Sequence, residues 1–219
     1  MYETSRMIGK AFGWAVMTLL ALAVASYALA LLLEPELRHP AALTLFSERP
    51  IATISHFAGS ALALAIGAFQ LNSRLRARFI GVHRWAGRLY VLGVITGGFA
   101  GLFLALQSSA GIVAQMGFGL LAMCWLGSTF AAYRHIRAGD LSAHRRWMIR
   151  SFALTWAAVT LRIYLPISQA AGVPFAVAYP AISWLCWVPN LLFAEWFIWL
   201  TRGVLPDHSF KPKPLRGTA

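Results

Sequence analysis

Acidic residues are scarce in this sequence. Its 219 residues include only 7 Asp and Glu, against 19 Lys and Arg, and 12% of the chain is charged. A soluble domain of this size carries about 25% charged residues. So few charges cannot solvate a chain that is 59% hydrophobic. The composition therefore excludes a water-soluble globule and indicates an integral membrane protein.

Cysteine and the common catalytic motifs are also sparse. Cys124 and Cys186 stand alone inside apolar runs, without the spacing of a metal site or a redox motif. We interpret both as small buried apolar residues. The sequence has no glycine-rich phosphate loop, no GxSxG, no HExxH and no CxxCH, so the enzyme classes that depend on these motifs are not indicated. We assign no catalytic residue.

Long apolar runs, by contrast, are abundant. A helix needs about 20 apolar residues to cross the hydrocarbon core, where it satisfies its own backbone groups. These runs predict an all-α, polytopic transmembrane bundle of about six spans in a single domain, with a polar C-terminal tail. The predicted spans are 13–33, 51–71, 89–107, 112–133, 151–171 and 179–200, and the tail is 202–219. The first run is too long for the apolar core of a signal peptide, usually about 7–15 residues, so we expect a retained span.

Basic residues gather on one side of these spans. The N-terminal tail carries two, the second-to-third and fourth-to-fifth connections carry five each, and the C-terminal tail carries four. The opposite side has only Arg38 and Arg49. The positive-inside rule therefore predicts cytoplasmic N- and C-termini and a place in the cell's inner membrane. Anionic lipid headgroups account for the arginines, so we expect no nucleic-acid partner.

The two basic connections resemble each other. Segments 73–84 and 134–145 align without gaps, and His83 then matches His144. The similarity favours a parallel repeat of two-span units, although two basic loops can also be alike by chance.

His83 and His144 are the main candidates for cofactor binding. Each precedes a span on the predicted cytoplasmic side and is followed by arginine and tryptophan. Two neutral imidazoles from separate helices at one depth can ligate the iron of a b-type haem. Nearby arginines could pair with its propionates or with anionic headgroups: Arg84, Arg88, Arg145 and Arg150. The alternative is that these clusters only anchor helices at the lipid interface.

Other polar groups lie inside the predicted spans, where they are expensive. His56 shares a helical face with small or polar residues through Gln70, and the third span repeats glycine at every fourth position from Gly93 to Gly101. These faces predict close helix packing. Arg162 is the only basic residue deep in a span, and its candidate partners are Asn190 and Glu195. They form either a structural link or, with His56, a site for an anionic or quinone-like ligand.

Three segments in combination resemble a bacterial membrane-protein family, domain of unknown function 2306. They are His83–Gly93, His144–Thr155 and Trp187–Leu191 with Glu195. The resemblance implies a six-span membrane protein with no known activity. A looser similarity is to the cytochrome b561 group, six-span electron carriers with histidine pairs. His83 and His144 fall on spans that supply such a pair there, whereas His56 has no histidine partner on the fourth span. The similarity thus implies at most one haem.

Three functions follow as hypotheses. The first is a redox protein with one b-type haem, or a link to a quinone, at His83 and His144. The second is a transporter or binding protein for a small ligand or anion, built around His56, Arg162, Asn190 and Glu195. The third is a non-catalytic factor for membrane assembly or lipid organisation.

Overall fold

The protein is a bundle of apolar helices. The computed structural model describes residues 2–38 and 40–201, and every regular element within them is helical. Five helical segments there are long and apolar enough to span a membrane: Ala11–Leu33, Pro50–Gln70, Ile80–Leu106, Ile112–Arg137 and Phe175–Thr201. The prediction of an all-α, multi-pass membrane bundle is confirmed.

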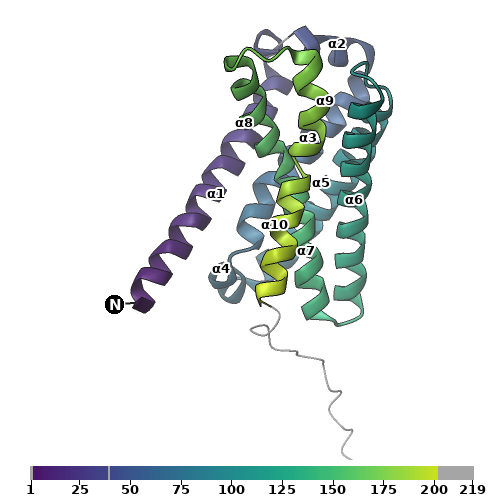
Figure 1. The fold of residues 1–219 in the computed structure, drawn as a ribbon. Coiled ribbons are helices and arrows are strands. Elements are labelled where there is room, and N and C mark those ends of the chain that lie inside the picture. Colours follow the sequence, from purple (N-terminus) through teal and green to yellow (C-terminus); the bar gives the residue numbers. More distant parts are fainter. Residues whose placement is uncertain (1, 39, 202–219) are drawn as a thin grey trace, which may run out of the picture.

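The chain crosses the bundle six times (Figure 1). The first four crossings are α1 (Tyr2–Leu33), α3 (Pro50–Gln70), α5 (Ile80–Leu106) and α6 (Ile112–Arg137). Between α1 and α3, the expected loop forms two short helices, η1 (Pro35–Leu37) and α2 (Pro40–Glu48). A third short helix, α4 (Ser73–Arg78), joins α3 to α5. We call the end that carries α4 the basic end and the end that carries α2 the distal end; α1 begins and α10 ends at the basic end.

The last two crossings are each divided near mid-height. The fifth consists of α7 (Leu141–Thr155) and α8 (Ala157–Ala170), and the sixth of α9 (Phe175–Leu185) and α10 (Val188–Thr201). The prediction of one helix over 151–171 therefore differs from the structure, in which this crossing begins at Leu141 and is interrupted at Trp156. The five segments of spanning length include the sixth crossing as a whole, Phe175–Thr201, but not the fifth, so five are found where about six were predicted.

Asn190 connects the two interruptions. Proline lacks an N–H, so Pro189 cannot donate to the carbonyl one turn earlier, and the sixth crossing breaks there. The side-chain Nδ2 of Asn190 donates to Cys186 O at 2.9 Å, to Thr160 Oγ1 at 3.0 Å and to Ala153 O at 3.4 Å. One amide thus bonds a backbone carbonyl at the break in the sixth crossing and a hydroxyl just after the break in the fifth. The amide fixes the two breaks at the same level.

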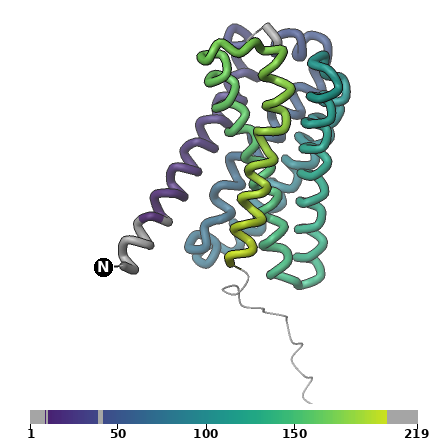
Figure 2. Tube along the Cα trace, in the orientation of Figure 1, coloured from purple at the N-terminus to yellow at the C-terminus, as the bar shows by residue number. Residues whose placement is uncertain are grey.

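Helices α3 and α5 approach each other closely along glycines, as the small-residue faces predict. A Cβ added to Gly97 would lie 2.9 Å from the backbone nitrogen of Ser60, and one added to Gly93 would lie 2.7 Å from the carbonyl of Gly59. Gly101 leaves room for the ring of His56, whose Nδ1 donates to Gly97 O at 2.8 Å. In Figures 1 and 2, α1 leans along the outside of the bundle, where it packs mainly on α3.

A buried polar network joins α5, α6 and α7. Tyr90 is fully buried, and its hydroxyl lies 2.8 Å from both Ser151 Oγ and Thr155 Oγ1. Trp125 Nε1 donates to Thr155 Oγ1 at 2.8 Å, and Thr129 Oγ1 lies 2.6 Å from Ser151 Oγ. Every hydroxyl in this network has a partner, which is what an apolar interior requires of buried polar groups.

Candidate functional site

His83 and His144 occupy equivalent positions at the basic end. Each is the fourth residue of its helix, α5 for His83 and α7 for His144. Each also precedes by seven residues, about two helical turns, one of the hydrogen-bonded residues Tyr90 and Ser151. The two imidazoles therefore lie at one level on facing helices, and they are within electrostatic range of each other. The aligned basic segments do bring their histidines together.

Capping side chains set where the helices of this region begin. Asp140 accepts from the backbone N–H of Ala143 at 2.8 Å and so starts α7. This bond and one from Ser142 stabilise the carboxylate and hold the pKa of Asp140 below its usual value. Asn72 accepts from the backbone N–H groups of Arg74 and Leu75 and starts α4. These caps are local, and they position His144 and Arg76 on their helices.

The two histidines differ in their hydrogen bonds. Nδ1 of His144 lies 2.9 Å from the carbonyl oxygen of Ala132, which can only accept, so Nδ1 carries the hydrogen and Nε2 keeps its lone pair. The imidazole of His83 makes no hydrogen bond within the described part of the chain. Arg76 is half-buried and lies within electrostatic range of both imidazoles. A ligand beside His83 would therefore meet an imidazole with free nitrogens and a nearby positive charge.

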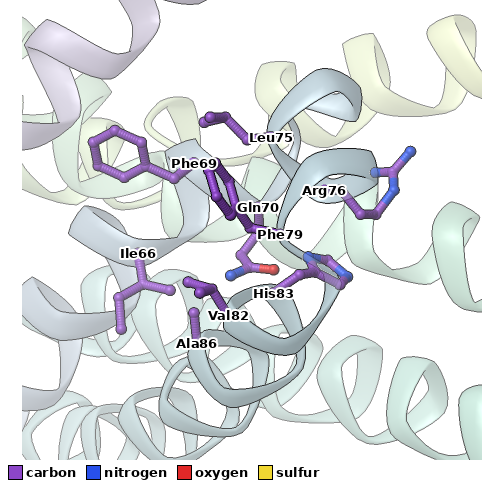
Figure 3. Close-up of a pocket in the computed structure, with 9 residues that line it drawn as sticks. All are labelled: Ile66, Phe69, Gln70, Leu75, Arg76, Phe79, Val82, His83 and Ala86. Atoms are coloured by element: carbon purple, nitrogen blue, oxygen red, sulfur yellow. The ribbon is translucent and has the colours of Figure 1, made fainter.

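A pocket of about 310 Å³ lies against His83. It is formed by the end of α3, by α4 and by the start of α5, and its lining residues are Ile66, Phe69, Gln70, Leu75, Arg76, Phe79, Val82, His83 and Ala86. Figure 3 shows the carboxamide of Gln70 projecting towards Val82 and His83. The Oε1 atom of Gln70 is buried without a hydrogen-bond partner. Such an orphaned atom calls for an explanation, and a ligand with a polar head would supply one.

The pocket opens to the outside of the helix bundle. Its wall residues Val82 and Phe79 are 67% and 48% exposed. On the α1 side, Trp14 packs edge-on against Phe69 and donates from Nε1 to Ala68 O at 3.0 Å. The site therefore combines an apolar cavity, open to the outside of the bundle, with the polar side chains of Gln70, Arg76 and His83.

The arginines predicted to hold propionates have different environments. Arg150 makes a two-point ion pair with Glu195, with Nε 2.5 Å from Oε1 and Nη2 2.8 Å from Oε2. It also lies over the ring of Trp147. This pair links α7 to α10 and engages both residues. Arg84, Arg88 and Arg145 are exposed at the basic end.

The polar groups predicted to meet deep in the membrane are only partly brought together. Asn190 bonds the helix breaks and Glu195 bonds Arg150, so neither is a partner of Arg162 in the structure. Arg162 instead lies over the ring of Tyr27 and within electrostatic range of His56. The predicted span began at Ser151, whereas the crossing begins at Leu141, so Arg150 lies inside the crossing and pairs with Glu195.

The comparison with known proteins covers most of the chain. A family model described as a predicted membrane protein (DUF2306) matches residues 53–198. The chain belongs to this family. The match runs from α3 to α10 and includes the pocket, both histidines, Arg162 and the helix breaks, whereas α1 lies outside it. The resemblance read from the sequence is confirmed. No curated protein and no solved structure gives a significant match.

The sequence-based prediction for this DUF2306 protein included some residues of the pocket and left out others. It placed Gln70 on a packing face and Arg76 in a basic loop, with no indication that α4 folds back to bring both beside His83. The hydroxyl network of Tyr90 was also missed, because isolated Ser and Thr residues in apolar runs carry no pattern. Among the described residues, no group of three His, Cys, Asp or Glu side chains could hold a metal ion.

Proposed function

We propose that this membrane protein binds an amphiphile of the quinone class in the pocket at the basic end. The observation that carries the proposal is the unpartnered Oε1 of Gln70 beside the free imidazole of His83, in an apolar cavity that opens to the outside of the bundle. A quinone partitions into the bilayer and would reach this cavity laterally.

The lining suits a flat head with an oxygen at each side. Gln70 offers a donor and an acceptor on one amide, and His83 offers a donor at one ring nitrogen and an acceptor at the other. Phe69 and Phe79 supply aromatic surface against which a planar ring can stack. Ligand pockets are commonly about 300–1,000 Å³, and the cavity, at about 310 Å³, accommodates a head group with its tail outside among the lipids.

Fluorescence of the purified protein tests the proposal. A short-chain benzoquinone bound here would quench Trp14, which packs on Phe69, and Trp14→Phe should remove that quenched component. A hydrogen bond contributes about 0.5–1.5 kcal/mol, so Gln70→Leu and His83→Leu should each weaken binding, by up to about tenfold. The matched control is Gln107→Leu, since Gln107 accepts from Arg49 at the distal end.

Two results would reject the quinone site. One is unchanged binding in both pocket variants. The other is a tightly held phospholipid, found by native mass spectrometry, that benzoquinone does not displace.

A b-type haem held by His83 and His144 is the second candidate. It is supported by the placement of the two imidazoles and by the bond from Nδ1 of His144 to Ala132 O. Haem-ligating histidines are commonly oriented by such a second bond, and Arg84 and Arg145 are near enough in sequence to meet propionates. A Soret band that is lost in both His83→Ala and His144→Ala supports this site. Colourless protein after expression with ample haem counts against it.

The His144→Ala variant distinguishes the two candidate ligands. Quinone binding in the pocket should survive His144→Ala, whereas axial ligation needs both rings. If neither ligand binds, the non-catalytic interpretation gains.

We also propose that the basic end faces the cytoplasm at the inner membrane and contacts anionic headgroups, because 16 of the 19 basic residues lie on that predicted side. Labelling of an Arg78→Cys variant from outside intact cells would reject this orientation.

A further inference from the structure

Arg162 is a cation inside the membrane with no carboxylate beside it. The ion pairs of the described residues join Arg49 to Glu48, His135 to Asp140 and Arg150 to Glu195. Arg162 takes part in none of these. Its own hydrogen bond runs from Nη1 to the carbonyl of Ala158 in the same helix, at 3.1 Å. A charge at this depth costs several kcal/mol, roughly, unless it is paired.

Three helices place their side chains at the same level around this cation. Tyr27 precedes the end of α1 by six residues, His56 follows the start of α3 by six, and Arg162 precedes the end of α8 by eight. At 1.5 Å per residue these positions are about 9–12 Å from the distal ends of the helices. The guanidinium carbon of Arg162 lies 5.6 Å from the centre of the Tyr27 ring. His56 cannot neutralise Arg162, because an imidazole is either neutral or positive.

One edge of the Arg162 guanidinium, formed by Nε and Nη2, makes no hydrogen bond within the described residues. Nε of Arg162 is buried without a hydrogen-bond partner. Nη2 also makes no hydrogen bond within the described residues, and it is not among their fully buried orphaned atoms. Two uncommitted N–H groups on a planar edge match the two oxygens of a carboxylate.

We propose that Arg162, between Tyr27 and His56, binds the carboxylate of a ligand that approaches from the distal half of the bilayer. A single negative charge matches the single cation, and two parallel N–H···O bonds use the unpartnered edge. Tyr27 is 47% exposed and forms the side from which a ligand would reach Arg162. The site is separate from the pocket at the basic end and does not depend on it.

The probes are sodium acetate and lauric acid, each compared with sodium chloride at equal ionic strength, and the measurement is the Tm of the full chain in an uncharged detergent. The carboxylates should raise the Tm of the wild-type protein more than chloride does. Arg162→Gln should abolish this difference. The matched control is Arg49→Gln, because Arg49 already has a carboxylate partner in Glu48, and this variant should respond as the wild type does.

A second variant covers the case in which Arg162→Gln does not fold. Arg162→Lys keeps the charge but loses the planar edge, so acetate or laurate should bind about tenfold or more weakly than to the wild type. Stabilisation by laurate alone indicates a fatty acid from the lipid phase, and equal stabilisation by acetate indicates a small soluble carboxylate. Chloride acting as strongly as both carboxylates, or Arg162→Lys binding them as well as the wild type, overturns the proposal.

Discussion

Replacing Asn190 by leucine tests whether one amide holds both helix breaks. Leucine has a similar size but offers no donor, so the carbonyl of Cys186 and the hydroxyl of Thr160 lose bonds of 2.9 and 3.0 Å. The 3.4 Å contact with Ala153 is long and adds little. A buried polar group left unpaired costs about 1–3 kcal/mol, whereas interhelical bonds in membranes average about 0.6 kcal/mol. We therefore expect Asn190→Leu to lower the free energy of unfolding by about 1–4 kcal/mol.

The assay is reversible unfolding in mixed micelles, followed by tryptophan fluorescence. A double-mutant cycle with Thr160→Val isolates the bond between the two side chains, and the two losses should fall short of additivity by about 0.5–3 kcal/mol. Thr201→Val is the control, because the hydroxyl of Thr201 bonds only within its own helix. A loss below about 0.5 kcal/mol for Asn190→Leu, the size of an ordinary surface substitution, would refute this role. So would strict additivity with Thr160→Val.

Further outcomes follow from the other contacts. Tyr90→Phe should lower the free energy of unfolding by about 1–2 kcal/mol in the same assay, because it removes a buried hydroxyl with two partners. Gly97→Leu should prevent α3 from packing on α5 and give protein that aggregates in size-exclusion chromatography, while Gly127→Leu, at an open position, should not. Arg150→Glu and Glu195→Arg should each lower the Tm, and their combination should recover part of the loss. The pKa of Asp140 lies below its usual value of 3.8, so its stabilising effect is present above pH ~4 and is lost as the pH falls through the lower folded value; Asp140→Asn should flatten that part of the acid-unfolding curve.

The sequence predicted a multi-pass helical membrane bundle because hydropathy is a property of composition and needs no tertiary contacts. It could not show that the fifth crossing is divided. The apolar run from 151 to 171 is unbroken, and the side chain that bonds Thr160, just after the interruption at Trp156, is Asn190 from another crossing. Proline marked only the partner break, at Pro189. A hydrogen bond between residues far apart in the sequence has no local sequence pattern from which it could be predicted.

Candidate sites were predicted less completely than the crossings. The alignment of the two basic segments placed His83 opposite His144 because each histidine has a fixed offset from the start of its helix. The partner of Arg162 was inferred from depth alone, and depth cannot tell which face of a neighbouring helix a carboxylate occupies. Glu195 instead pairs with Arg150, which lies inside the fifth crossing because that crossing begins at Leu141 and not at the predicted Ser151. The pocket depends on how α4 folds back, and this helix of six residues is too short to show a hydrophobic periodicity that would predict its position.

The glycine contacts between α3 and α5 restrict what the pocket can admit. Where backbones touch directly, no side chain remains that could slide or change rotamer to let the helices separate. Two of the three elements that line the cavity are thus held to each other by direct backbone contacts, whereas the short α4 has none of these glycine contacts. We therefore expect α3 and α5 to stay together when a ligand binds, and flat head groups to fit the cavity more easily than bulky ones.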